Sequence, residues 1–147
     1  MTTRATSFRR AEGLGDEPFA LILLDAEDRH IRRKRITLAN GEDILVDFEK
    51  PVKLEHGDRL VLEDGRVAQV LAAEEELMEV RAKDSRHLTL LAWHIGNRHL
   101  PAQIGENCIL LRRDRVIRQM LEALGATVRD VTERFAPEYG AYHSHEH

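Results

Sequence analysis

The feature that most constrains the fold is a change of hydrophobic period near residue 75. Before this point, apolar residues occur in short β-rich runs. After it, they recur at the i, i+3, i+4 and i+7 spacing of amphipathic helices. Two periods within 147 residues predict two structural units, joined near Ala72 to Glu75.

Five short runs in the first half are typical of strands, at 19–26, 29–38, 43–48, 58–64 and 66–73. Turn residues separate them, at Asn40-Gly41, at Gly57 and at Asp64-Gly65. Glycine suits these turns because it adopts positive φ without a steric penalty. The first half therefore predicts a small β barrel or sandwich.

The second half predicts the order strand, helix, two strands, helix, strand. The strands are expected at 76–82, 101–104, 108–113 and 127–135. Asp84 or Ser85 can cap the first helix and Asp114 the second, because a side-chain oxygen there accepts a backbone N–H of the first turn. The expected core faces are Leu88, Leu91, Ala92 and Ile95, and Val116, Ile117, Met120, Leu121 and Leu124.

Gly96, Asn97 and Gly125 are suitable helix stops, since these residue types tolerate positive φ. A βαββαβ order predicts a ferredoxin-like domain. The predicted fold class is thus α+β: a small all-β domain at 1–74, a ferredoxin-like domain at 75–136 and a flexible histidine-containing tail at 137–147.

Composition narrows the classes of function. No apolar run approaches the ~20 residues that a membrane helix needs, and no secretory core follows the N-terminus, so a cytoplasmic protein is expected. A net charge of −4 argues against nucleic acid as the main partner. The single cysteine, Cys108, excludes an internal disulfide and a multi-thiolate zinc site, so a metal site would depend on histidine and carboxylate.

His94 and His99 stand five positions apart around Gly96-Asn97. Five residues of helix advance ~500°, so one continuous helix cannot direct both imidazoles at one metal. His99 beyond the helix end could instead meet its copy across a two-fold axis, where one histidine becomes two ligands. The simpler interpretation keeps His94 near the terminal helix carbonyls and His99 merely exposed.

His143, His145 and His147 alternate with Ser144 and Glu146 at the end of the chain. In an extended chain, alternate side chains point the same way, so two or three of these imidazoles could reach one ion. Imidazole suits nickel, zinc, copper and iron, so the pattern does not identify the metal. A solvated polar terminus or a tag remnant is the competing interpretation.

Several other features indicate no reaction. The basic run 29–35 has few aromatic neighbours, so a charged strand edge or a protein-docking patch is favoured over nucleic-acid binding. Cys108 lies in an apolar strand, where cysteine is more often a core residue than a nucleophile. The chain has no P-loop and no GxSxG motif, and we expect no enzyme.

The chain resembles the urease accessory protein UreE family, the nickel metallochaperones of urease maturation. The resemblance rests on "LAWHIGNRHLPAQI" (91–104), on the helix "DRVIRQMLEALG", and on the terminal "FAPEYGAYHSHEH". In the first half, "RRKRITL", "GEDILVDF" and "HGDRLVLEDG" follow in the order expected of the family's N-terminal domain.

The resemblance implies a homodimer that binds Ni(II) as cargo and delivers it to the apo-urease activation complex, with a urease accessory GTPase as direct partner. By position, His99 matches the motif histidine that binds metal at the dimer interface. His143, His145 and His147 match the region that completes or supplements this site, whereas His94 does not match a ligand.

One departure from the family concerns "LRRDR" (111–115), where some relatives carry histidines. Arginine stays protonated and offers no lone pair, so additional metal sites there are in doubt. Three alternatives to nickel delivery remain: a metal-independent protein-interaction module, a general zinc- or copper-binding protein, and a metal-dependent hydrolase. The hydrolase would need several fixed ligands in one pocket, and the sequence offers one.

Overall fold

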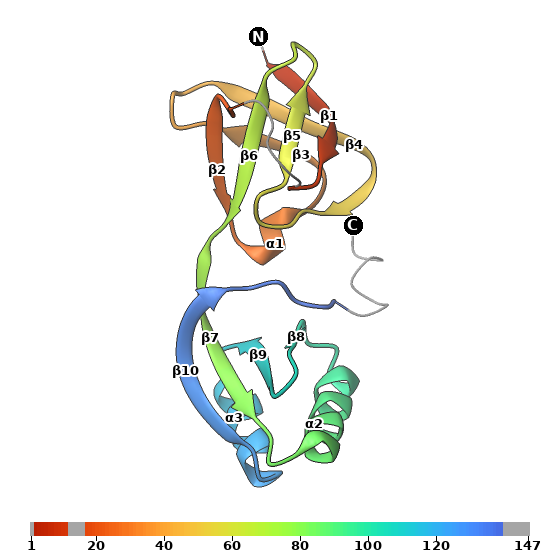
Figure 1. Cartoon of the computed structure of the whole chain (residues 1–147), viewed down its shortest axis with the longest axis vertical. Coiled ribbons are helices and arrows are strands. Elements are labelled where there is room, and N and C mark those ends of the chain that lie inside the picture. Colours follow the sequence, from red (N-terminus) through yellow and green to blue (C-terminus); the bar gives the residue numbers. More distant parts are fainter. Residues whose placement is uncertain (1, 12–16, 140–147) are drawn as a thin grey trace. The chain divides into compact units, whose positions relative to one another are not determined.

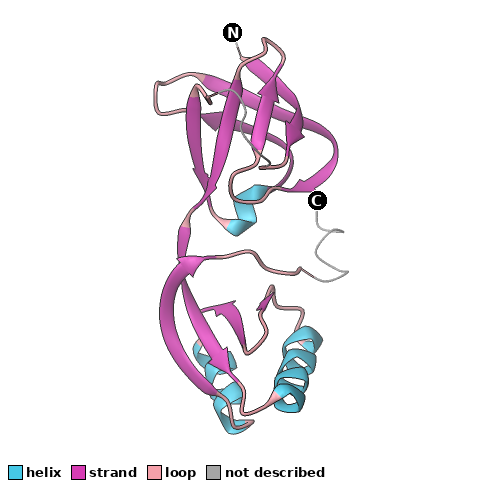
Figure 2. Cartoon of the chain, in the orientation of Figure 1, coloured by secondary structure: helices cyan, strands magenta, loops and turns pink. Residues whose placement is uncertain are grey.

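The computed structural model of the chain describes residues 2–11 and 17–139. They form two compact units, divided between Ala73 and Glu74. The described chain is mixed α+β and mostly strand, with two sheets and three helices (Figures 1 and 2). The expected tail lies outside the described residues from Gly140 onward.

The N-terminal unit is built on one six-stranded sheet, in the order β2-β6-β5-β1-β4-β3. Its elements are β1 (Thr3–Arg9), β2 (Ala20–Leu24), α1 (Ala26–Arg29), β3 (His30–Thr37), β4 (Asp43–Lys53), β5 (Arg59–Leu62) and β6 (Val67–Ala72). The described part of this unit is thus a single sheet around one core, where the sequence predicted a barrel or sandwich (Figure 2).

Two elements of this unit were not predicted. Strand β1 runs parallel to β4 and antiparallel to β5, and only Ala5 of its seven residues is buried. It therefore lacks the apolar alternation that identifies a strand in sequence. Helix α1 follows because β2 ends at Leu24, and the carboxylate of Asp25 accepts the N–H of Asp28 at 2.8 Å.

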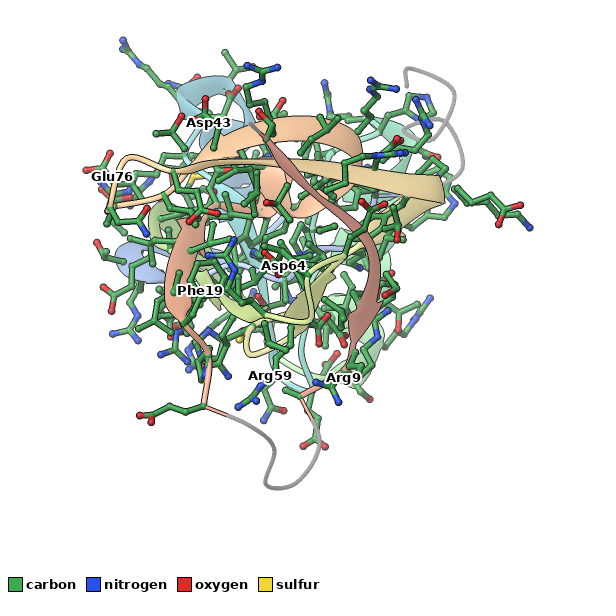
Figure 3. The ribbon with its side chains drawn as sticks, turned by 90° about the horizontal axis from the view of Figure 1, so that it is seen from above. Arg9, Phe19, Asp43, Arg59, Asp64 and Glu76 are labelled. Carbon is green, nitrogen blue, oxygen red and sulfur yellow. The ribbon has the colours of Figure 1, made fainter. Side chains whose placement is uncertain are left out.

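The predicted turns are confirmed, since Gly41, Gly57 and Gly65 all have positive φ. Arg66 then clamps the hairpin that contains Gly65. Its Nε donates to Asp64 at 2.8 Å, and its guanidinium lies 4.3 Å from the ring centroid of Phe19. Figure 3 labels Asp64 and Phe19, which come from the hairpin turn and from the chain just before β2. The bond to Asp64 lowers the pKa of this carboxyl.

The C-terminal unit has a four-stranded sheet in the order β10-β7-β9-β8, with every pair antiparallel. The elements are β7 (Glu74–Arg81), α2 (Ser85–Asn97), β8 (Gln103–Ile104), β9 (Cys108–Arg112), α3 (Arg115–Ala123) and β10 (Thr127–Arg134). They follow the predicted order of strands and helices. No helix of the described chain is both long and apolar enough to cross a membrane.

Both helices begin at the predicted caps. Asp84 accepts the N–H of His87 at 2.8 Å, and Asp114 accepts the N–H of Ile117 at 3.0 Å. The helices pack on the sheet through a core that includes Met78, Val80, Leu91, Ile95, Ile109, Leu111, Ile117, Leu121 and Val128. Because α2 is packed against the sheet, it fixes the start of the segment that follows it, which includes His99.

Candidate metal site

His99 lies two residues beyond the last residue of α2, in the connection where the sequence predicted it. Its backbone N–H donates to the carbonyl of Gly96 at 3.0 Å, and its side chain is exposed. Its φ is +56°, so His99 is the residue that turns the chain out of the helix. The helix ends at Asn97, within the predicted stop, but the positive φ expected of Gly96 or Asn97 occurs at His99 instead.

A left-handed histidine is an unusual helix stop. An L-residue with a Cβ in this conformation is disfavoured by about 1–2 kcal/mol, and glycine would avoid that cost. Non-glycine residues held in this region cluster at functional sites. The backbone conformation of His99 is therefore an observation, independent of the sequence motif, that singles this residue out.

His94 differs from His99 in setting. Its side chain is half-buried on the last turn of α2, and its ring meets Trp93 edge-on with 5.0 Å between centroids. On a continuous helix, positions 94 and 99 point ~140° apart. Helix α2 runs without a break through Asn97, so no interruption within it turns the two side chains toward each other. His94 is thus an aromatic neighbour of Trp93.

His99 has few potential co-ligands within one chain. Among residues 2–11 and 17–139, no three His, Cys, Asp or Glu side chains are grouped so that they could hold a metal ion. Cys108 is half-buried at the start of β9. The described residues therefore do not by themselves provide a cluster of three such side chains around His99.

The tail histidines His143, His145 and His147 lie outside the described residues, but the segment that leads to them is described. Glu138 forms an antiparallel bridge with Ala102, with N···O distances of 3.1 and 2.7 Å. Antiparallel partners run in opposite directions, so the chain leaves Glu138 toward Pro101. The root of the tail is thus fixed three residues from His99 along the neighbouring segment.

Sequence reasoning missed the role of His87, at the other end of α2. Its Nδ1 accepts the N–H of Lys83 at 2.9 Å, and its Nε2 lies 2.8 Å from the carbonyl oxygen of Leu124, to which it donates in the matching tautomer. The imidazole thus connects the start of α2 with the end of α3. Leu124 is 37 residues away, so no local pattern could have indicated the contact.

The basic run on β3 is largely neutralised by acidic neighbours. Arg32 and Arg33 lie within 4.0 Å of Asp47, and Lys34 binds Asp28 at 2.6 Å. The hydrogen bond from Arg4, and then the charge of Arg33, keep the pKa of Asp47 below its usual range. The run is thus an ion-paired edge strand of the sheet.

Helix α2 carries two large exposed apolar side chains. Leu90 and Trp93 are 46% and 61% exposed and lie one turn apart on the helix. Neighbouring exposed apolar side chains are typical of interaction sites. Leu90 and Trp93 are therefore candidates for an interface on the helix that ends before His99.

Comparison with known proteins gives matches over both units. The family model "UreE urease accessory protein, N-terminal domain" matches residues 2–73, and the corresponding C-terminal domain model matches residues 75–147. These two matches cover the six-stranded sheet and the unit that carries His99.

Individual relatives agree. The chain is 58% identical to the urease accessory protein UreE of Brucella abortus over 140 residues, which cover 95% of this chain and 82% of the relative. It is 54% identical to that of Agrobacterium fabrum over 142 residues, or 97% and 88%. These relatives are named as accessory proteins and not as enzymes, in agreement with the expectation from sequence. The chain belongs to the family of UreE urease accessory proteins.

Proposed function

We propose that this protein is a nickel metallochaperone that delivers Ni(II) to the apo-urease activation complex during urease maturation. The observation that carries the proposal is His99, an exposed histidine in a left-handed conformation at the end of a capped helix, in a chain of a urease accessory family. Its proposed partners are a urease accessory GTPase and the activation complex, and its proposed location is the cytoplasm.

The proposed site is completed by a second copy of the chain. A two-fold axis beside His99 supplies two imidazoles to one ion without any further ligand from either chain. The exposed side chains of Leu90 and Trp93 support a contact between copies on this face, because their burial would contribute a hydrophobic term. The antiparallel strand order β10-β7-β9-β8 supports the ferredoxin-like arrangement proposed for residues 75–136.

His143, His145 and His147 are the proposed additional ligands. The bridge between Glu138 and Ala102 supports this role because it fixes the root of the tail near His99. His143 is the fourth residue after Tyr139, and an extended chain spans at most about 14 Å over four residue steps. His99 is three residues from Ala102, or at most about 11 Å. The proposed bounds of the other two parts of the chain are residues 1–74 for the N-terminal domain and residues 137–147 for the tail.

A site with only a few imidazole ligands suits the transfer of a metal. Imidazole nitrogens bind nickel, zinc and copper, so the cargo is set by supply and partner as well as by the site. An imidazole binds metal only when it is neutral, and a typical histidine has a pKa of about 6.5. Nickel affinity is expected to be lower at pH 5.5 than at pH 7.5, because protons compete with the metal for the imidazole nitrogens, and titration calorimetry at the two pH values measures the difference.

Calorimetric titration with nickel tests the proposal. Loss of an outer residue that only supports a metal ligand costs 10–100-fold in affinity, so His99→Ala should weaken nickel binding by at least about 100-fold. His94→Ala is the matched control, with a histidine of the same helix region, and should bind as the wild type does. If His99→Ala retains wild-type affinity, the central site is wrong.

A second candidate function rests on the N-terminal unit. Leu21 and Leu23 of the edge strand β2 are 56% and 68% exposed, and an edge strand offers backbone groups to an extended partner segment. In that case the chain would act as a metal-independent protein-interaction module. Urease activation at limiting nickel would then survive His99→Ala with the tail removed, and would be lost on Leu21→Lys with Leu23→Lys.

A further inference from the structure

The two edges of the six-stranded sheet in the N-terminal unit differ in chemistry. One edge is β3, which carries the consecutive basic residues 32–35. Charged side chains on an edge strand discourage pairing with another chain, and so does proline. The other edge is β2, which lies beside β6 and has the sequence ALILL, without a charge or a proline (Figure 1). The edge at β2 therefore lacks the protection that β3 has.

Strand β2 also offers backbone groups on its open side. Within the described residues it pairs with β6 alone, in parallel. The N–H of Phe19, just before β2, donates to the carbonyl of Val67 in β6 at 2.9 Å. Successive N–H groups of an extended chain point to opposite sides, so those of Ala20 and Ile22 point away from β6. They can pair with the backbone of an extended segment laid beside β2.

The side chains of β2 favour an apolar occupant. Leu21 and Leu23 are more than half exposed, whereas Ile22 and Leu24 belong to the core. The side chains of an added strand would alternate between these two pairs of neighbours. An apolar run fits both faces, because one set of its side chains would extend the core and the other set would cover the exposed leucines.

Acidic residues lie near both ends of β2. Glu17 stands three positions before its first residue, and Glu27 stands three positions after its last. Both side chains are exposed, and neither carboxylate has a hydrogen bond or an ion pair among the described residues. Complementary charge on a partner would therefore be basic at both ends of the bound run.

We propose that β2 binds an extended segment of a partner protein, made of about five apolar residues with lysine or arginine on both sides. The length of the run is that of Ala20–Leu24. A second copy of β2 is a poor occupant, because antiparallel pairing would bring acidic ends together. This surface belongs to a different unit from His99 and needs no metal, so it gives the interaction module of the second candidate function a partner class.

NMR titration of the full-length protein with a peptide tests the proposal. The probe has a run of valine and isoleucine between pairs of lysines, and in the control peptide glutamate replaces lysine. We expect the lysine peptide to shift the amide resonances of Ala20 and Ile22, to protect both amides from hydrogen exchange, and to bind roughly tenfold more tightly than the control. Unshifted amides would overturn the proposal. So would protection that appears without peptide and grows with protein concentration, because the occupant would then be a second copy.

Two double variants locate the contacts. Leu21→Ser with Leu23→Ser should weaken binding of the lysine peptide by at least about tenfold, because the apolar cover is lost. Val116→Ser is the matched control, since Val116 of α3 is 67% exposed and lies in the other unit, and it should bind as the wild type does. Glu17→Lys with Glu27→Lys should reverse the preference between the two peptides. Equal binding by the serine double variant and the wild type would refute the site.

Nickel titrations separate this surface from the proposed metal site. His99→Ala should bind the lysine peptide as the wild type does, and Leu21→Ser with Leu23→Ser should bind nickel as the wild type does. If the wild type binds the peptide at β2 but binds no nickel, the edge site stands and the metallochaperone role fails. If it binds nickel but not the peptide, the edge site fails and nickel delivery is unaffected.

Discussion

The two ends of helix α2 use the same residue type in opposite ways. At the first turn, both ring nitrogens of His87 contact backbone groups, those of Lys83 and Leu124, so neither nitrogen is available to a metal. Beyond the last turn, His99 is exposed and its backbone is left-handed. Histidine content alone therefore does not locate a metal site, because a ring such as that of His87 can be occupied by backbone groups.

The largest expected difference between His87→Ala and His99→Ala is in how far nickel raises the free energy of unfolding. A ligand that binds only the folded state, at a free concentration 100 times its dissociation constant, stabilises by about 2.7 kcal/mol. We expect this gain in the wild type and in His87→Ala, and at most about 0.4 kcal/mol in His99→Ala, whose affinity is expected to be at least about 100-fold lower. Denaturation curves with and without nickel measure it, and a full nickel effect in His99→Ala would break the comparison.

The next effect is on stability without metal. His87→Ala removes two hydrogen bonds to the backbone, each worth about 0.5–1.5 kcal/mol, so a loss of about 2 kcal/mol is expected. Urea denaturation of the metal-free protein measures this loss. His94→Ala, on the same helix, should change stability by less than about 1 kcal/mol. An equal loss in the two variants would mean that the contact to Leu124 does not stabilise the packing of α2 on α3.

The smallest effect concerns the backbone of His99. Glycine has no Cβ to oppose a φ of +56°, so His99→Gly should be more stable than His99→Ala by about 1 kcal/mol. Both variants lack the imidazole and should lose nickel binding equally. Equal stability of the two variants would show that the left-handed conformation is not retained in solution.

Sequence reasoning succeeded where the determinants are local. The caps Asp84 and Asp114, the turn glycines and the position of His99 beyond a helix all follow from patterns within a few residues. It failed for β1, which lies inside the sheet but has only one buried residue, Ala5, and so lacks the alternation of apolar residues that indicates a strand. It also failed for His87, whose partner Leu124 lies at the end of another helix. The helix stop at Gly96-Asn97 was predicted correctly, but the left-handed residue is His99 and not one of these two.

The candidate site was predictable in part. The motif identified His99 and the family, because both depend on residue identity at fixed spacing. The bridge between Glu138 and Ala102 was not predictable, since it depends on how the segment before β8 and the segment after β10 meet in space. No periodicity in the sequence encodes such meetings.

The bridge at Glu138 has a further consequence for how the proposed tail ligands act. A short tether fixed beside its target gives its imidazoles an effective concentration in the millimolar range, which falls roughly as the −3/2 power of tether length. Twelve Gly-Ser residues inserted after Tyr139 would lengthen the tether to His143 from four residues to sixteen. The local concentration of imidazole at His99 would then fall about eightfold, while every ligand remained in place.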